Sequence, residues 1–310
     1  EQPLYALPGG VASEVIVCRQ NVLESEGLVN AQGEPLPLTS LDELLERAKA
    51  LTGRGRWGLA FAGGEAGHPL LDAWLPFLYA YGGGVWDARQ WTSVGFVDGP
   101  EAIEATRFFA ALHLEHNVVA PDSTRWTESD LASAFLSGNV LMALAWSDAV
   151  PDFRRTAGEN DPAVLALPGR QDEEGNVTRG ALFRGTAAGI SSYSNRKDEG
   201  WQFIQWLRSR DTDMMLMNAP NSGFVSPRAD LHSYAATLFP WYRVFLVQDL
   251  PVLRDVWNTA DEPRLTTILD RELGELYRGR KPVEAALQDA VTAMEPLYQS
   301  SVERPAARGE

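Results

Sequence analysis

Short apolar runs alternate along this chain with longer segments in which apolar residues recur every three or four positions. The runs WGLAFAGG (residues 57–64) and NVLMALAW (residues 139–146) have the length and composition of buried strands. The stretch TSLDELLERAKALTG (residues 39–53) has apolar residues at helical spacing, with Ser40 and Glu43 placed as a capping box and a glycine at its end. Strands that alternate with helices predict an α/β fold, in which helices cover the faces of a sheet.

Other segments continue this alternation. Residues 4–17 are predicted to be extended, the last hundred or so residues are predicted to be mainly helical, and further helices are predicted at residues 69–81, 101–115, 128–138 and 198–209. On the last of these helices, Trp201 and Trp206 lie five positions apart in an amphipathic pattern. We expect both rings to face the core.

The chain has 310 residues, of which 45% are hydrophobic, so it can bury the core of one large domain or two ordinary ones. Its 42 acidic residues outnumber its 27 basic residues and give a net charge of −15. Phosphate backbones and anionic membrane surfaces repel such a chain, so we expect neither nucleic acid nor a membrane surface as a partner. Without a visible signal peptide or an apolar run that could span a bilayer, the residues favour a cytoplasmic protein or a mature or trimmed piece of an exported one.

Residue types that support metal or covalent chemistry are scarce. Cys18 is the single cysteine, and His113 and His116 are spaced three apart with no third ligand in evidence. The sequence has no P-loop, no G-x-G-x-x-G motif after a predicted strand and no G-x-S-x-G turn. We therefore expect no metal site, no cofactor and no enzymatic activity.

Tryptophan is the unusual residue type here, with ten in the chain, many of them beside glycine or proline turns. A flat aromatic ring stacks on the apolar face of a sugar, and planar polar side chains then bond its hydroxyls. Trp146 follows a predicted buried strand, at the end where α/β sheets place ligand-binding residues. Asp148, two residues later, either accepts a hydrogen bond from a ligand hydroxyl or caps a turn or helix.

The stretch AGGEAGHPLLDAW (residues 62–74) is a second candidate region. Its glycines would let a ligand approach the backbone, and the start of the following helix offers free N–H groups. The candidate side chains are Glu65, His68, Asp72 and Trp74, and the alternative is that they only build the start of a helix. Trp126, in DSTRWTESD, is a further candidate to line a ligand cleft.

A series of segments in a fixed order resembles the family 1 extracellular solute-binding proteins, the ligand receptors of ABC importers, which often bind sugars. Nearly the whole chain is covered by these segments, which include LYALPGG, TSLDELLERAKALTG, LPFLYAYGGGVWD, SAFLSGNVLMALAWSD, GTAAGISSYSNRKDEGWQFIQWLRS, SGFVSPRADL and YRGRKPVEAALQDAV. The resemblance implies a periplasmic-binding-protein-like type II fold, in which two α/β lobes are joined by crossover strands and hold a ligand in the cleft between them.

The resemblance also implies how the lobes divide. The chain begins where the family's first crossover into the second lobe normally lies. Residues 1–181 and 231–310 would then form a nearly complete second lobe, and residues 182–230 would be a residual segment of the first lobe. The implied function is to bind a carbohydrate outside the cytoplasm, at the cell surface or in the periplasm, and deliver it to the permease subunits of an importer.

Individual residues inherit expectations from this resemblance. Trp146 aligns with the family's ligand-stacking tryptophan, Arg184 and Gly185 lie on a strand that borders the cleft, and Arg264 precedes a helix where relatives often place a cleft residue. The family's frequent Tyr-Asn pair is replaced by Cys18-Arg19, which puts one common cleft contact in doubt. This departure favours an uncommon ligand, or an acidic sugar held by Arg19, Arg184 or Arg264.

Two other functions remain open. A chain without most of its first lobe could be a remnant or a protein-interaction module that binds no ligand, and an exposed apolar face would then be expected. A glycoside hydrolase also uses tryptophans and acids, but it needs two convergent carboxyl groups, for example Asp148 with Glu65.

Overall fold

The computed structural model describes residues 5–64, 69–154, 162–171, 174–219, 222–238, 242, 253, 254, 257 and 259–303. A six-stranded sheet has the order β2-β3-β1-β7-β8, with β4 also paired to β1, and β5 and β6 form a separate pair. The strands are β1 (Ala6–Cys18), β2 (Ala60–Phe61), β3 (Met142–Trp146), β4 (Ala163–Leu165), β5 (Gly169–Gln171), β6 (Val177–Arg179), β7 (Ala181–Gly189) and β8 (Leu253–Arg254). The predicted α/β class is confirmed.

β1 is the strand around which the sheet is organised. Its C-terminal half pairs antiparallel with β3 and places Glu14 opposite Trp146. Its N-terminal half pairs antiparallel with β7 and places Ala12 opposite Arg184. One continuous strand therefore brings β3 and β7, which are far apart in the sequence, onto neighbouring positions of one sheet.

Side chains along β1 and β3 alternate between two apolar clusters, as the period of a strand requires. Ile16 and Leu144 lie in the larger cluster, which contains residues of α2, α3, α4, α11 and α12. Val15, Val17 and Ala145 lie in the smaller cluster, which contains residues of α5, α6, α8 and α9. The sheet is therefore covered by helices on both faces.

The helices have the following bounds. Those on the face of the larger cluster are α2 (Leu41–Leu51), α3 (Pro69–Ala80), α4 (Pro100–Leu114), α11 (Glu262–Tyr277) and α12 (Val283–Glu303). Those on the other face are α5 (Glu128–Leu136), α6 (Val150–Arg154), α8 (Arg210–Met217) and α9 (His232–Leu238). The remaining elements are α1 (Gln20–Ser25), α7 (Lys197–Leu207) and the 3-10 turns η1 (Pro121–Arg125), η2 (Ser147–Ala149) and η3 (Ala229–Leu231).

The helix ends follow the sequence signals. The backbone N–H of Glu43 donates to Oγ of Ser40 over 3.1 Å, so Ser40 caps α2 as predicted. The Glu43 carboxylate accepts from the backbone and the hydroxyl of Thr39, both over 2.8 Å, rather than from the cap residue itself. Thr127 and Asp130 form a complete capping box at the start of α5.

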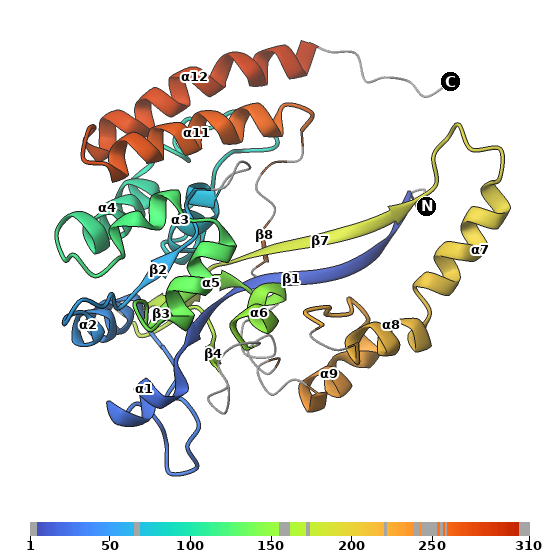
Figure 1. The fold of residues 1–310 in the computed structure, drawn as a ribbon. Coiled ribbons are helices and arrows are strands. Elements are labelled where there is room, and N and C mark those ends of the chain that lie inside the picture. Colours follow the sequence, from blue (N-terminus) through green and yellow to red (C-terminus); the bar gives the residue numbers. More distant parts are fainter. Residues whose placement is uncertain are drawn as a thin grey trace.

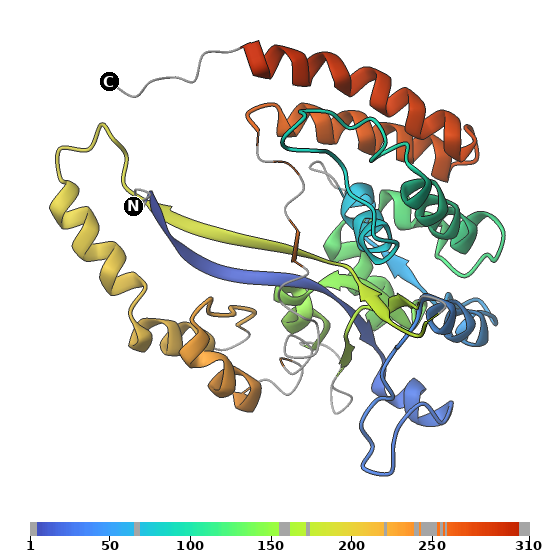
Figure 2. The same ribbon diagram turned by 180° about the vertical axis from the view of Figure 1, so that it is seen from behind.

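β1 and β7 form a long two-stranded ribbon that leaves the helix-covered part of the sheet (Figure 1). α7 lies past the far end of this ribbon, α8 and α9 lie along its side away from α11 and α12, and the opposite view shows the same arrangement (Figure 2). α9 lies against α8, and Nδ2 of Asn218 donates to the hydroxyl of Tyr234 over 2.7 Å. The segment on this side of the ribbon therefore continues past residue 230.

The expectation that Trp201 and Trp206 face the core is wrong. On α7, Trp201 is 38% exposed, and Phe203 and Trp206 are each 56% exposed. The rings of Phe203 and Trp206 lie 5.7 Å apart. Ile204 is the buried residue of this helix, so its aromatic side chains lie on a face that nothing in the described part of the chain covers.

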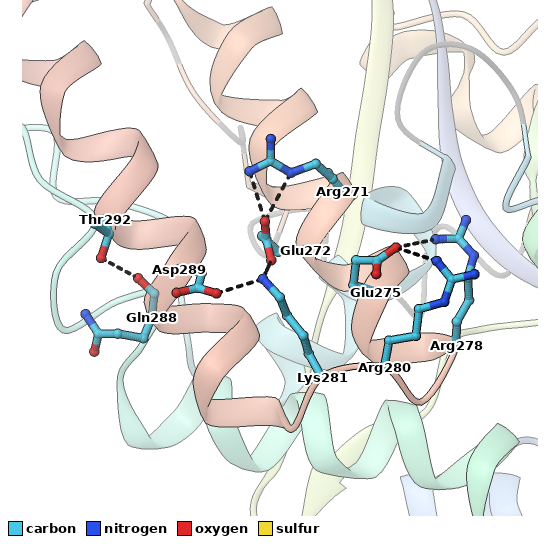
Figure 3. Close-up of polar contacts among 9 residues, drawn as sticks. All are labelled: Arg271, Glu272, Glu275, Arg278, Arg280, Lys281, Gln288, Asp289 and Thr292. Carbon is cyan, nitrogen blue, oxygen red and sulfur yellow. Dashed lines mark hydrogen bonds and ion pairs between the residues drawn. The ribbon is translucent and has the colours of Figure 1, made fainter.

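Ionic contacts tie α11 to α12 across the turn between them (Figure 3). The buried carboxylate of Glu272 accepts from Nε and Nη2 of Arg271, over 3.0 and 2.9 Å, and also pairs with the ammonium of Lys281. Nζ of Lys281 reaches the carboxylate of Asp289 on α12 over 2.7 Å. This network fixes the helix pair that packs on α3 and α4.

Candidate functional site

Four side chains from three strands share one face of the sheet. Residues directly opposite each other on antiparallel strands have side chains on the same face, and so do residues two apart on one strand. Glu14 lies opposite Trp146, Ala12 lies opposite Arg184, and Ala12 and Glu14 are two apart on β1. The site is therefore built by strand pairings across sequence separations of more than a hundred residues.

Arg184 is the centre of the polar contacts. Its guanidinium carbon lies 4.3 Å from the centroid of the Trp146 ring, which is a cation–π contact. Nη2 donates to both carboxylate oxygens of Asp148, over 2.8 and 2.9 Å, and Nη1 lies 3.5 Å from Oε1 of Glu128. Asp148 belongs to the turn η2, which follows directly after Trp146 at the end of β3.

A cavity of about 530 Å³ lies beside this group, within the size range of small-molecule pockets. Its polar side chains belong to Asp148, Arg184, Thr186 and Arg208. Glycine, alanine and valine residues of β1, β7 and the 223–225 loop form much of the remaining wall, with Leu207 and Phe224. The ribbon thus forms one wall of a cavity that has two arginines and one carboxylate at its surface.

Two carboxyl groups of the site have raised pKa values. Glu14 is buried, and burial raises its pKa well above the ordinary value, with a further rise from the charge of Asp72. Burial raises the pKa of Asp72 to about 7; the charge of Arg184 opposes this rise, and Asp270 and other carboxylates add to it. Asp270 also accepts a hydrogen bond from the backbone N–H of Leu71 over 2.9 Å, at the start of α3.

The structure brings together several of the predicted site residues. Arg184 contacts both Trp146 and Asp148, Gly185 lines the cavity with Asp148 and Arg184, and Asp72 is electrostatically coupled to Arg184. Both carboxylate oxygens of Asp148 accept from Arg184, and the cap position of η2 is Trp146, with no side-chain cap. These five residues remain the candidates for ligand contact.

Trp74 was wrongly predicted to contact a ligand. Its ring is completely buried in the core, and its indole N–H donates to Oγ1 of Thr106 over 2.9 Å. Trp74 lies on α3 two residues after Asp72, so it projects into the packing with α4 instead of toward Arg184. Glu65 and His68 lie outside the described residues.

Two further candidates lie apart from this group. The ring of Trp126 packs against the smaller apolar cluster, whereas Trp146 packs against the larger one on the other face of the sheet. Arg264 is exposed at the start of α11, and its nearest acidic partner is Asp261 at 3.5 Å. Neither Trp126 nor Arg264 lines the cavity in the described part of the chain.

The glycines of the 62–74 stretch allow close approach of protein backbone. A Cβ on Gly64 would lie 2.1 Å from the backbone of Arg125, and the Gly64 N–H donates to the carbonyl of Trp126 over 2.9 Å. A Cβ on Gly63 would also lie too close to the carbonyl of Ser123, at 2.8 Å. These glycines are needed where the chain passes η1, a structural reason that the sequence did not reveal.

The arginine at the Cys18-Arg19 departure has a structural contact. Nη1 of Arg19 donates to the carbonyls of Phe135 and Leu136, over 2.8 and 3.2 Å, at the end of α5. Cys18 is completely buried, and burial raises the pKa of its thiol to about 12, so it stays protonated at neutral pH. Of the three arginines considered for an acidic sugar, Arg184 alone lines the cavity, and its guanidinium already binds Asp148.

Glu14 and Glu128 are the acidic residues near Arg184 that the sequence analysis missed. Glu14 is the one charged residue in the apolar run SEVIVC. A charged side chain is rarely buried in such a strand without a partner, so its presence there is a signal of a polar site. Glu128 is the first residue of α5, where an acidic side chain is ordinary, so no local signal marked it.

The described residues offer little to a metal ion or a bilayer. No three histidine, cysteine, aspartate or glutamate side chains among them are grouped to hold a metal ion. The ring of His113 stacks on Tyr277, with centroids 4.8 Å apart. Over the same residues, none of the helices combines the length and the apolar character that crossing a membrane requires.

Comparison with known proteins identifies what this arrangement resembles. The sequence matches the model of a family described as bacterial extracellular solute-binding protein over residues 2–214. Among solved structures, maltose-bound T. maritima MalE3 is similar with 22% identity and a TM-score of 0.77, over 94% of this chain and 72% of that chain.

Two other solved structures show the same fold. A solute-binding protein of an ABC transporter from Agrobacterium radiobacter K84, in complex with ribitol, has 18% identity and a TM-score of 0.75, over 94% of this chain and 71% of that chain. The GacH receptor of Streptomyces glaucescens, studied with acarbose, has 19% identity and a TM-score of 0.75, over 96% of this chain and 72% of that chain. The likeness extends over nearly all of this chain and confirms the predicted periplasmic-binding-protein type II fold.

Proposed function

The chain belongs to the family of bacterial extracellular solute-binding proteins, and from this premise we propose that it is a receptor for a carbohydrate or a sugar alcohol. It binds this ligand outside the cytoplasm, in the periplasm or at the cell surface, and delivers it to the permease subunits of an ABC importer. It acts by binding and release, without catalysis.

One observation carries the proposal: the indole of Trp146 lies at the end of β3 with a carboxylate, a guanidinium and a cavity beside it. An aromatic ring offers a stacking surface to the C–H face of a sugar, and the carboxylate of Asp148 offers an acceptor to its hydroxyls. Gly185 leaves room for close approach at the cavity wall. Asp72, with a pKa near 7, can either donate or accept a hydrogen bond at neutral pH.

The similar structures support the ligand class. They were solved with maltose, with ribitol and with acarbose, which makes carbohydrates and sugar alcohols the first compounds to test on this chain. One structural feature opposes an acidic ligand. The carboxylates of Asp148 and Glu128 already pair with Arg184, the one arginine of the three considered that lines the cavity.

We also propose that the chain divides close to the bounds that the sequence indicates, into a second lobe of residues 1–181 and 231–310 and a first-lobe segment of residues 182–230. To this segment we add α9, because it lies against α8. The separation of α7 and α8 from α11 and α12 along the β1–β7 ribbon supports this division. In this proposal the ribbon is the hinge, and closure of the lobes around the ligand is the state that the permease recognises.

Titration of intrinsic tryptophan fluorescence and thermal melting with maltose, ribitol and acarbose test the proposal. A ligand present at a hundred times its dissociation constant adds about 2.7 kcal/mol to the free energy of unfolding, which raises the melting temperature by several degrees. We expect one of these compounds to give both signals.

The Trp146→Ala variant should lose the fluorescence change and bind at least tenfold more weakly, because the stacking surface is gone. Trp201→Ala, which removes an exposed tryptophan of α7, is the matched control and should bind like the wild type. Equal binding by the wild type and Trp146→Ala would show that the ligand binds elsewhere. Absence of binding to any compound of a broad carbohydrate panel would contradict the proposed function.

A further inference from the structure

One face of the Trp146 ring is occupied by a side chain of the protein itself. The guanidinium carbon of Arg184 lies 4.3 Å from the ring centroid, at the distance of a stacked cation. Arg184 and Asp148 line the cavity, whereas Trp146 is not among its lining residues in the described part of the chain. The guanidinium therefore lies between the cavity and the indole.

We propose that Arg184 is a displaceable occupant of the ligand site, which covers Trp146 in the ligand-free protein and must leave the ring before a sugar can stack there. This inference rests on the proposed function. It makes Arg184 a residue that sets affinity by competition, which differs from the role of a direct ligand donor expected from the sequence.

Arg184 also occupies the Asp148 carboxylate, which is the hydrogen-bond acceptor of the proposed site. Both carboxylate oxygens of Asp148 bind Nη2 of Arg184, so the carboxylate is engaged by the guanidinium while Trp146 is covered. A single movement of Arg184 uncovers the stacking surface and frees the carboxylate for a ligand hydroxyl. The two groups that the ligand needs thus become available together.

The exposure of the pair makes such a movement feasible. The side chains of Arg184, Asp148 and Glu128 are 43%, 40% and 39% exposed, and ion pairs this accessible to water are weak. Nη1 of Arg184 already lies 3.5 Å from Oε1 of Glu128. Glu128 can therefore receive the guanidinium when it leaves Asp148, so the charge of Arg184 stays paired in the ligand-bound state.

Competition of this kind has a calculable size. If the covered state is the main state of the free protein, the apparent dissociation constant equals the intrinsic constant divided by the uncovered fraction. One exposed ion pair and one exposed cation–π contact correspond to an uncovered fraction between about one quarter and one thirtieth. Removal of Arg184 should therefore tighten ligand binding between about fourfold and thirtyfold.

The test compares the dissociation constants of the wild type, Arg184→Ala and Glu128→Gln for maltose, ribitol and acarbose by calorimetry. We expect Arg184→Ala to bind more tightly, and Glu128→Gln to bind a few-fold more weakly because the guanidinium loses its second partner. In the double variant the Glu128→Gln effect should vanish, which is the non-additivity expected when both residues act through one side chain.

The chain contains a matched control for the substitution. Arg170 lies over the ring of Tyr81 at 4.5 Å and pairs with Glu104 over 3.3 Å, so it has the same kind of contacts away from the site. Arg170→Ala should leave every dissociation constant unchanged. Thermal melting of each variant shows whether it is folded. Acrylamide quenching of tryptophan fluorescence should show greater exposure of Trp146 in Arg184→Ala than in the wild type. The signal of Trp146 is obtained by subtracting the quenching of the same proteins that also carry Trp146→Phe.

The outcomes separate this inference from the proposed function. Weaker or unchanged binding by Arg184→Ala, with the wild type still binding, would overturn the inference and leave the receptor function standing. Unchanged quenching of Trp146 would overturn it as well. Absence of binding by the wild type and all variants would reject the proposed function together with the inference.

Discussion

Asp72→Asn should remove a pH-dependent loss of stability that the wild-type protein carries between about pH 4 and pH 7. Burial raises the pKa of this carboxyl from 3.8 to about 7, so the folded protein holds the proton more tightly than the unfolded chain does. An asparagine has nearly the same shape and stays neutral at every pH. The variant therefore isolates the free energy of ionising one buried carboxyl group.

The sign and the size follow from the two pKa values. Below about pH 4 the carboxyl is protonated in both states and contributes nothing. Between pH 4 and pH 7 the unfolded chain ionises first, so the wild type loses stability as pH rises, and above pH 7 the loss is complete. Three pKa units correspond to about 4 kcal/mol, which is the largest gain in unfolding free energy that Asp72→Asn can show at pH 8.

Urea unfolding of the wild type and Asp72→Asn at pH 4.5, 6 and 8 measures this difference directly. The difference in unfolding free energy should grow with pH in favour of the variant, whatever constant offset the substitution itself introduces. Asp42→Asn, which removes an exposed carboxyl group in the first turn of α2, is the matched control for the change of side chain. A difference for Asp72→Asn that is flat across this range, or that shrinks toward pH 8, would refute the reasoning.

Three other substitutions test the structure. Trp74→Phe should lower the free energy of unfolding by about 1–3 kcal/mol, because it removes a buried hydrogen bond and part of the ring volume. Ligand affinity should stay unchanged. Weaker ligand binding by a variant that is still folded would show that Trp74 belongs to the ligand site. Glu272→Gln should lower the free energy of unfolding by about 1–3 kcal/mol, because Arg271 and Lys281 both lose a buried charged partner, and this effect should weaken in high salt. Replacing Phe203 and Trp206 by serine should raise the solubility limit without lowering the melting temperature, since both rings are half exposed; a large fall in melting temperature would show that this face is packed in solution.

Local sequence signals predicted the individual elements well. The predicted helices at 39–53, 69–81 and 101–115 correspond to α2, α3 and α4, and the glycine after α2 has a φ of +142°. Apolar periodicity and capping residues act within a few positions, so they can be recognised without knowledge of the rest of the chain. The apolar run that ends at Trp146 was placed correctly for the same reason.

The contents of the core and the surface were harder to predict, because they depend on what each helix packs against. α3 and α7 both have tryptophans, on a helix that is apolar nearly all round in α3 and in an amphipathic pattern in α7. Trp74 is completely buried because α3 lies between the sheet, α4 and α11, and Trp206 is exposed because no described element covers that side of α7. The pattern of a helix shows that it has an apolar face, and only the tertiary structure shows whether that face is buried.

The site depends most strongly on strand register, which the sequence does not express. A shift of one residue in the pairing of β1 with β3 would turn Glu14 away from Trp146 and into the apolar cluster on the other face of the sheet. The observed register instead places Glu14 on the same face as Arg184, whose charge lowers the pKa of Glu14 against the effect of burial. The alternation that buries Ile16 and Leu144 therefore also determines that an acidic side chain lies beneath the guanidinium. Packing of the core and the electrostatics of the site are thus consequences of one register.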